Sequence, residues 1–578
     1  MYKKVLIFGF CLSVLQFDIV QNNGIQNIPL KGFGRALKSE EKVVQSIQNQ
    51  EPLLANEQQP DEDDWWLPES VPKTSNCGYI EKVYQQHLSW KQLNPSEGVY
   101  DFSQLDALQK NNTDFWIMPY FADSLFFPVW VAEKYKLHAY QYPMDDYDDG
   151  TGHPHTYRPG IGRERSTARM YPIWDPGVVH ELSILLTALA NHPVMQSDHF
   201  KYIYVPGAWR WSEWGTEFVG QMKRSGMKKE DYLQDMYKLL DSFASAFAGN
   251  ATKLVFTGYN EWENVGDKDW TMFLNRKISK YAISKNMGAR HGWSENFNCG
   301  LNNMPDWGLT LKLQDGRYYP VPIDTVPLVQ NVNNWFYAEN ECFGGCDGEK
   351  AEEVAKYYNW KMSTLKVLQI RMKQILPSRS LLYKYPDFKL YVEKTLGKSI
   401  NNTPDVWACL RSCNDWLYDP HLGLDGRTTV HNWERWLYQR DVSPDGLTEN
   451  TYKALDFMFH ANEPVFEAKK TLHEKGSDYI YFNIDDRFVN GYTGSYMIKV
   501  TYLDNFKGKW HLQYQTSKKL YKNSNEIINA GDNKWKTISV IINDAGFANG
   551  QKHGNDFRIY NGGKSDITVR FVRVIKIS

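Results

Sequence analysis

The sequence predicts an α/β domain followed by a smaller all-β domain. Over residues 76–475, short apolar runs alternate with longer segments of helical period, such as "VVHELSILLTALANH". Such alternation favours a parallel sheet covered by helices. Residues 476–578 instead carry short runs such as "SYMIKVTYL" and "ITVRFVRVIKI" between Gly, Asn and Asp turns, a pattern typical of an antiparallel β-sandwich. A chain of 578 residues, 42% of them hydrophobic, is long enough to build both cores.

The N-terminal region precedes both domains. Residues 1–20 contain two lysines and then an apolar run that is too short to span a bilayer, which predicts a secretory signal peptide and a secreted, extracellular or lysosomal location. Residues 21–75 are rich in Gln, Asn and acidic side chains, which predicts a polar, poorly ordered leader. Three N-glycosylation sequons agree with secretion, at Asn111, Asn250 and Asn401.

The cysteine count fits an oxidising compartment. Of seven cysteines, Cys11 lies in the predicted signal peptide, so six remain in the mature chain. The cysteines of two C-x3-C motifs, Cys342 and Cys346 after the seventh strand and Cys409 and Cys413 after the eighth, are expected to form disulfides that brace neighbouring loops beside the site, and the sequence leaves their connectivity open. A four-thiolate zinc site is the alternative, which secretion disfavours. We therefore predict neither a metal nor a cofactor.

Strand counting refines the α/β prediction. A short strand is expected around Cys77, and eight βα units are what a (β/α)8 TIM barrel needs, with its active site at the carboxyl ends of the strands. The sequence therefore predicts such a barrel over residues 76–475 and a β-sandwich accessory domain over residues 476–578. The other seven strand candidates follow in the runs "QQHLSW", "DFWIMPYFA", "KYIYVPGAW", "LVFTGYNEW", "ARHGWSENF", "NNWFYAENE" and "DVWACLR".

One stretch places aromatic rings around carboxylates at such a strand end. "YVPGAWRWSEWGTE" follows the run "FKYIYV" and contains Trp209, Trp211 and Trp214 on either side of Glu213. Flat aromatic faces stack on the CH faces of sugars, and the chain is 15% aromatic. An apolar wall also raises the pKa of a nearby carboxyl group, as an acid catalyst requires. These residues predict a carbohydrate site with Glu213 as its proton donor.

Two longer segments resemble a known group of enzymes. "SWKQLNPSEGVYDFSQLDAL" resembles the segment after the second strand in many glycoside hydrolases of clan A, and "DPGVVHELSILLTALANHP" resembles the helix before their fourth strand. These are retaining (β/α)8 enzymes that include β-galactosidases. The resemblance implies an acid/base glutamate after the fourth strand, Glu213, and a nucleophile at the end of the seventh, either Glu339 or Glu341. Retention requires the two carboxyl groups to lie about 5–5.5 Å apart.

The match departs from the family at one position. Many members place Asn directly before the acid/base glutamate, whereas Ser212 stands there in this chain. Asn260 and Glu261 in "YNEW" offer a competing match, which strand counting places on the fifth strand. Both are kept as substrate-binding candidates. Further substrate-binding candidates near expected strand ends are Trp90, His153, His155, Trp293, Trp335 and Tyr337.

Charge limits the classes of partner. The formal net charge is −2 and no block of lysines or arginines occurs, so neither nucleic acid nor an anionic membrane is expected as a partner. The segment "GRERSTARM" places Arg163, Arg165 and Arg169 near the expected sugar site, where guanidinium groups fit an anionic polysaccharide. Arginines on a helix surface are the alternative interpretation.

Two functions follow from these observations. The leading hypothesis is a secreted retaining glycoside hydrolase that cleaves a β-linked poly- or oligosaccharide by double displacement. The alternative is a non-catalytic carbohydrate-binding protein on a degenerate hydrolase scaffold, because one fold hosts many functions. The presence of both candidate carboxylates favours the enzyme.

Overall fold

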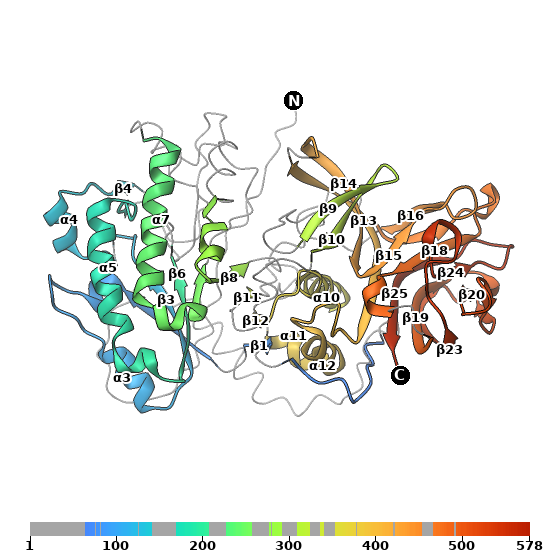
Figure 1. Cartoon of the computed structure of the whole chain (residues 1–578), viewed down its shortest axis with the longest axis horizontal. Helices are drawn as coiled ribbons and strands as arrows, with labels where there is room; N and C mark the ends of the chain where they lie inside the picture. Colours follow the sequence, from blue (N-terminus) through green and yellow to red (C-terminus); the bar gives the residue numbers. More distant parts are fainter. Residues whose placement is uncertain are drawn as a thin grey trace.

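The structure of the chain is a computed structural model. Figure 1 shows the helix-covered parallel sheet mostly in blue to green, and the other two large sheets mostly in orange to red apart from residues 309–322, which are yellow-green. The model describes residues 64–74, 77–80, 83–124, 126–141, 169–206, 227–256, 277–278, 280–291, 309–323, 336–339, 353–376, 379–419, 422–453, 466–489 and 493–577.

An eight-stranded sheet forms the centre of the first half, and each of its neighbouring strand pairs is parallel. Parallel strands end at one edge of their sheet, so this arrangement collects the carboxyl ends of all the strands along a single edge. In spatial order the strands are β2 (Tyr84–Ser89), β3 (Phe115–Tyr120), β6 (Phe200–Val205), β7 (Leu254–Phe256), β8 (Gly288–His291), β11 (Phe336–Glu339), β12 (Gln374–Leu376) and β1 (Gly78–Tyr79).

The prediction of a (β/α)8 TIM barrel is wrong. Strands β1 and β2 are separated only by residues 80–83, whereas a crossover between parallel strands takes about a dozen residues or more. Strands β1 and β2 are therefore two parts of one chain segment. The eight strands come from only seven segments, whereas a (β/α)8 barrel needs eight, each followed by a helix. The expected eighth strand, "DVWACLR", instead begins β13 (Asp405–Asp419), which pairs antiparallel with strands of a second sheet.

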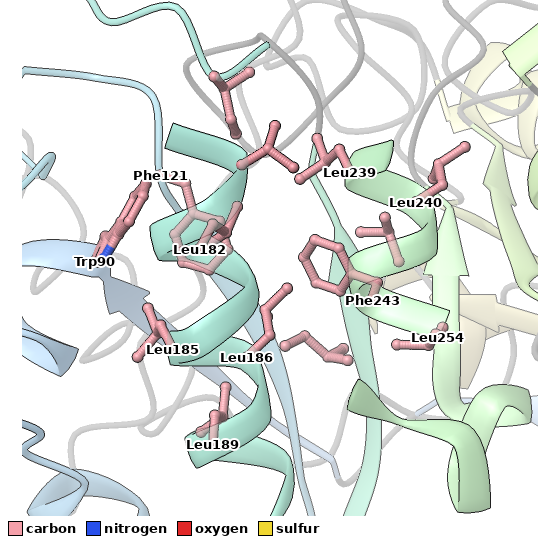
Figure 2. Close-up of a cluster of buried hydrophobic side chains, with 14 of the residues drawn as sticks. Trp90, Phe121, Leu182, Leu185, Leu186, Leu189, Leu239, Leu240, Phe243 and Leu254 are labelled. Atoms are coloured by element: carbon pink, nitrogen blue, oxygen red, sulfur yellow. The ribbon is translucent and has the colours of Figure 1, made fainter. Parts of the chain in front are cut away.

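Helices cover one face of the parallel sheet. Helix α5 (Pro176–Ala190) begins where Asp175 accepts a hydrogen bond of 2.8 Å from the Gly177 amide, with a proline at its first position. Helix α7 (Lys229–Ala246) packs beside it, and Figure 2 shows Leu186 of α5 on the side that faces Phe243 of α7. The other short helices and strands of this half are α2 (Trp90–Leu93), α3 (Ser103–Lys110), α4 (Val129–Tyr135), β4 (Tyr140–Gln141) and β5 (Arg169–Met170).

Strand alternation gives the sheet two different faces. In β3, Phe115 and Ile117 join the apolar core under the helices, whereas Trp116 belongs to a separate, largely aromatic cluster on the opposite face. The rings of Trp116 and Tyr202 stack there with their centres 5.2 Å apart. Successive side chains of a strand point to opposite sides, so these aromatic rings lie together on the face that the helices do not cover. That face extends to the carboxyl edge of the sheet.

The second half consists of two mainly antiparallel sheets that enclose a common core. Its strands begin well before residue 476, where the sandwich was expected, because β13 and its partner β14 (Leu424–Arg435) already belong to it. The remaining strands of its larger, nine-stranded sheet are β9 (Leu309–Gln314), β10 (Arg317–Pro322), β16 (Thr448–Lys453), β17 (Phe466–Thr471), β19 (Gly494–Asp504), β23 (Lys534–Ala545) and β25 (Thr568–Lys576).

The smaller, six-stranded sheet closes the other side of this core. Ile480 and Ile559 from this sheet and Val572 from the larger one are fully buried in the same cluster. Because side chains alternate along each strand, the residues between the core residues point to the opposite face of the six-stranded sheet, away from this core. The strands of the six-stranded sheet are β15 (Leu437–Arg440), β18 (Tyr479–Ile484), β20 (Lys507–Tyr514), β21 (Lys522–Asn523), β22 (Ile527–Ala530) and β24 (Phe557–Tyr560).

A short N-terminal segment, residues 64–67, connects the two halves. Trp65 is buried, and its indole NH donates a hydrogen bond of 3.0 Å to the Tyr357 hydroxyl. Arg573 donates to the backbone carbonyl of Asp64 over 2.8 Å, and the Asp64 carboxylate pairs with Lys499. The remaining helices are α10 (Glu353–Gln369), α11 (Arg379–Lys384), α12 (Pro386–Thr395) and α13 (Asp486–Val489).

Candidate functional site

Most of the predicted site residues lie outside the described residues. Their placement stays a prediction, and so does the separation of the two catalytic carboxyl groups and the proximity of the arginines in "GRERSTARM". The residues concerned are Glu213, Glu341, His153, His155, Trp209, Trp211, Trp214, Asn260, Glu261, Trp293 and Trp335.

Strand β11 carries the predicted site residues Tyr337 and Glu339. Glu339 is the last residue of the strand and pairs in parallel register with Leu376 of β12, while Ala338 pairs with His291 of β8. The backbone of Glu339 therefore lies at the carboxyl edge of the sheet. Strand β6, which precedes Glu213 in the sequence, ends at the same edge.

The structure places Trp90 in the core. Its side chain has no exposed surface, and its ring packs edge-on against Phe127 at 5.1 Å between ring centres and against Phe121 at 5.9 Å. Trp90 belongs to the buried cluster under the helices, and Figure 2 shows it beside Phe121. Full burial argues against a direct contact between Trp90 and a substrate.

The predicted disulfide of Cys409 is wrong, because its thiol is free and buried in β13. The expectation assumed a loop, whereas Cys409 and Cys413 lie on one strand. A strand rises about 3.3 Å per residue, which separates their Cα atoms by about 13 Å, far beyond the 7 Å that a disulfide can bridge. Burial raises the pKa of Cys409 to about 11. Cys342 and Cys346 lie outside the described residues.

At the carboxyl edge, the described residues form a polar contact that sequence analysis missed. His87 of β2 lies with its Nδ1 2.6 Å from the hydroxyl of Tyr120 in β3, and the two rings are nearly parallel at 5.4 Å between centres. The Tyr120 hydroxyl also lies 3.7 Å from the Met118 sulfur, to which it donates. Burial lowers the pKa of His87 to about 4, so its imidazole is neutral near pH 7.

The second ring nitrogen of His87, Nε2, determines whether this pair can bind a further group. Nε2 is buried and makes no hydrogen bond to any residue that the structure describes. A neutral imidazole held through Nδ1 can donate or accept one further hydrogen bond, according to its tautomer. The period-two placement of polar residues in "QQHLSW" is the sequence signal that could have found it.

A second polar surface lies on the outer face of the six-stranded sheet. Alternation sends Ile480 and Ile559 into the core and leaves their neighbours on the opposite face. We call this surface the tyrosine–arginine face, and it consists of Tyr479, Tyr481, His511, Gln513, Tyr521, Arg558 and Tyr560.

Arg558 is at the centre of the tyrosine–arginine face. Its guanidinium carbon lies 3.6 Å from the ring centre of Tyr479 and 4.2 Å from that of Tyr521. Its Nε donates a hydrogen bond of 2.7 Å to the Gln513 side-chain oxygen, and Nη1 donates to the Tyr481 hydroxyl. These contacts fix the arginine and the rings in one arrangement.

Further rings extend this arrangement across the sheet. Tyr560 stacks on Tyr479 at 5.0 Å between ring centres, and His511 meets Tyr560 edge-on at 5.2 Å. Tyr521 is 38% exposed, while Tyr479, Tyr560 and His511 are each partly exposed. The face therefore offers flat, solvent-accessible rings beside hydrogen-bonding groups.

The carboxylate of Asp445 borders the tyrosine–arginine face. Asp445 accepts a hydrogen bond of 2.8 Å from Lys552 and one of 3.2 Å from the Tyr481 hydroxyl, and lies 4.0 Å from Arg558 Nη1. Burial raises the pKa of Asp445, but the Lys552 hydrogen bond and other contacts outweigh it and hold the pKa below its ordinary value. Asp445 is therefore ionised and paired with Lys552 near neutral pH.

A separate buried polar cluster lies within the antiparallel half. Lys469 of β17 donates a hydrogen bond of 2.6 Å to the Gln439 side chain, and Arg440 donates one of 2.6 Å to Glu434. The Arg440 guanidinium also lies over the Tyr319 ring at 3.7 Å. Burial lowers the pKa of Lys469 to about 7. Because Lys469 is completely buried, we assign this cluster to structure rather than to ligand binding.

In the described part of the chain, no group of three or more His, Cys, Asp or Glu residues is placed to hold a metal ion. None of the helices in those same ranges is long and apolar enough to cross a membrane.

Neither a protein-family model nor a curated protein matches the sequence. Among solved structures, a carbohydrate-binding module of Cellvibrio mixtus lichenase 5A in complex with cellotriose is 15% identical and covers 24% of this chain and 91% of its own, with a TM-score of 0.15. The C-terminal carbohydrate-binding module of LamC from Zobellia galactanivorans is 13% identical and covers 24% of this chain and 99% of its own, with a TM-score of 0.14.

The third similar structure is a larger protein. Isomalto-dextranase of Arthrobacter globiformis T6, complexed with panose, is 10% identical and covers 71% of this chain and 74% of its own, with a TM-score of 0.18. All three similar proteins bind or process carbohydrate by their descriptions. At these TM-scores the likeness says nothing about the function of this chain.

Proposed function

We propose that this protein binds carbohydrate through the tyrosine–arginine face of its six-stranded sheet. The observation that carries the proposal is the set of partly exposed rings, Tyr479, Tyr521 and Tyr560, held beside hydrogen-bonding side chains on one sheet face. Aromatic faces stack on the CH groups of sugar rings, and polar side chains bind the hydroxyl groups at their edges.

The contacts within this face favour binding in two ways. Stacking on Arg558 fixes the rings of Tyr479 and Tyr521 before any ligand arrives, which lowers the entropy lost on binding. The Gln513 amide donates a hydrogen bond of 3.1 Å to exposed Asn523 and accepts one from Arg558, so its orientation is also fixed. A preorganised polar group can recognise a hydroxyl in a defined position.

The test is binding of the protein to a panel of plant and algal glycans, measured by affinity electrophoresis and calorimetry. Tyr560→Ala removes a stacking ring, and a stacking contact of about 1–1.5 kcal/mol corresponds to roughly tenfold in the dissociation constant. The matched control is Tyr383→Ala, which removes a tyrosine that is 62% exposed on α11. Unchanged binding by Tyr560→Ala, or no binding of any glycan by the wild type, would refute the proposal.

Retaining glycoside hydrolysis at the carboxyl edge is the second candidate function, and secretion remains part of it. The position of Glu339 at the end of β11 favours it, because β6 ends at the same edge and leads into the segment of Glu213. Two carboxyl groups above one sheet edge are what double displacement of a β-linked glycoside needs.

The hydrolase candidate is tested separately from binding. Glu213→Gln is expected to reduce turnover of natural glycans by about 10²–10⁴, with a far smaller loss for substrates that have activated leaving groups. Proton NMR of the first product gives the stereochemistry. Initial release of the inverted anomer would exclude double displacement, and an equal loss on both substrate types would remove Glu213 from the acid/base role.

A further inference from the structure

We propose that the tyrosine–arginine face selects an anionic glycan, one that carries carboxylate or sulfate groups, and that Arg558 binds the anionic group. This inference rests on the proposed carbohydrate binding and specifies its substrate class. It is carried by the hydrogen bonds and charges around Arg558.

Among the described residues, the guanidinium of Arg558 has one nitrogen, Nη2, without a hydrogen bond. Its Nε bonds to Gln513 and its Nη1 to Tyr481, while Nη2 makes no hydrogen bond to any described residue. Tyr479 and Tyr521 lie within 3.6 and 4.2 Å of the guanidinium carbon, so a ligand reaches the group at its edge. A planar guanidinium edge is well suited to the oxygens of a carboxylate or sulfate.

The neighbouring charges leave Arg558 without full compensation. Asp445 is its closest acidic partner among the described residues, at 4.0 Å, but this carboxylate is already hydrogen-bonded to Lys552 at 2.8 Å. One negative charge therefore faces two positive ones. Asp478, near Tyr479, lies 2.6 Å from His473 and is paired with it. An anionic ligand would balance the remaining positive charge.

The burial of Arg558 strengthens this preference. Its side chain is only 11% exposed, so the aromatic rings keep most water away from the charge. A hydrogen bond in which either partner is ionised is roughly twice as strong as a neutral one, and a carboxylate or sulfate adds a charge–charge attraction that reduced hydration strengthens. A neutral sugar hydroxyl compensates this charge less well than a carboxylate or sulfate oxygen does.

The experiment compares matched pairs of polymers by calorimetry with the full chain. One pair is a polyuronate and its carboxyl-reduced form, and the other is a sulfated galactan and its desulfated form. The wild type is expected to bind at least one anionic member about tenfold more tightly than its neutral counterpart, and added NaCl is expected to weaken that binding.

Two variants assign the preference to Arg558. Arg558→Lys removes the planar edge, and the matched control is Arg487→Lys, at a 48% exposed arginine on α13. Gln513→Glu keeps the shape of the face but places a carboxylate at Arg558 Nε, so it tests the same charge even if Arg558→Lys destabilises the fold. Both variants are expected to lose about tenfold on the anionic polymer, and the control to lose nothing.

The outcomes separate this inference from the proposed function. Equal binding of charged and neutral polymers, with loss in Tyr560→Ala, refutes anionic selection and leaves carbohydrate binding in place. Retained anionic preference in Gln513→Glu and Arg558→Lys also refutes the role of Arg558. Absence of binding to every polymer refutes both proposals.

Discussion

Replacing Lys469 by methionine is expected to stabilise the protein near neutral pH, and the gain should disappear in alkali. Lys469 is completely buried, and burial lowers its pKa from 10.5 to about 7 in the folded protein. The unfolded chain keeps the ordinary pKa and so binds the proton more tightly. Folding therefore carries a penalty that is complete below about pH 7 and vanishes as the pH approaches 10.5.

The size of the penalty follows from the shift in pKa. A change from 10.5 to about 7 corresponds to at most about 5 kcal/mol of unfolding free energy at or below neutral pH. Methionine fills a similar volume without a charge but loses the hydrogen bond to Gln439, worth about 1 kcal/mol. Gln439 still accepts a hydrogen bond of 3.0 Å from Asn432. We expect a net gain of a few kcal/mol at pH 6 that falls to zero, or becomes a small loss, by pH 10.

Urea unfolding at pH 6, 8 and 10 measures this gain. The control is Lys470→Met, because the neighbouring Lys470 is partly exposed and pairs with Glu449 at 3.3 Å on the surface. That variant is expected to change stability by less than about 1 kcal/mol at every pH. A gain in Lys469→Met that is the same at all three pH values, or a wild type that loses stability between pH 7 and 9, would show that the amine is not the cause.

Three further outcomes follow from residues at and near the candidate site. Trp90→Ala should lower the free energy of unfolding by about 3–5 kcal/mol and leave glycan affinity unchanged. A loss of glycan affinity without a lower urea midpoint would show that Trp90 contacts the ligand. Cys409 should resist iodoacetamide in the native protein and react after unfolding, as read by mass spectrometry, and rapid native labelling would contradict its burial. His87 should stay neutral from pH 8 down to about pH 5, so a ¹⁵N imidazole titration with a midpoint near 6.5 would show that its environment is not the buried one described.

Local sequence predicted strands better than it predicted their partners. The runs in β3, β6 and β7 were recognised because their apolar residues are continuous, as parallel strands buried on both faces require. "DVWACLR" has the same apolar character but pairs with β25, where Asp405 binds Arg573. The choice of sheet depends on residues more than a hundred positions away, which a local pattern does not contain.

The candidate site was predicted unevenly for the same reason. Alternation in β18 and β24 correctly indicated a sheet with one buried face, yet the tyrosine–arginine face depends on Arg558 of β24 meeting Tyr479 of β18. Similarly, His87 and Tyr120 contact each other only because β2 and β3 pair in a particular register. Sequence spacing gives the period of a strand, whereas the neighbours across strands depend on register.

The contact of Trp65 with the last strand has a consequence for the order of events during synthesis. The Trp65 ring lies 5.7 Å from that of Phe571 in β25 and 4.5 Å from that of Phe388. At about 5–20 residues per second, the ribosome needs tens of seconds between Trp65 and Phe571. A nascent chain therefore carries an incompletely covered tryptophan until translation is almost finished. Chains that terminate before β25 leave that apolar surface open, where chaperones and proteases can recognise an unfinished product.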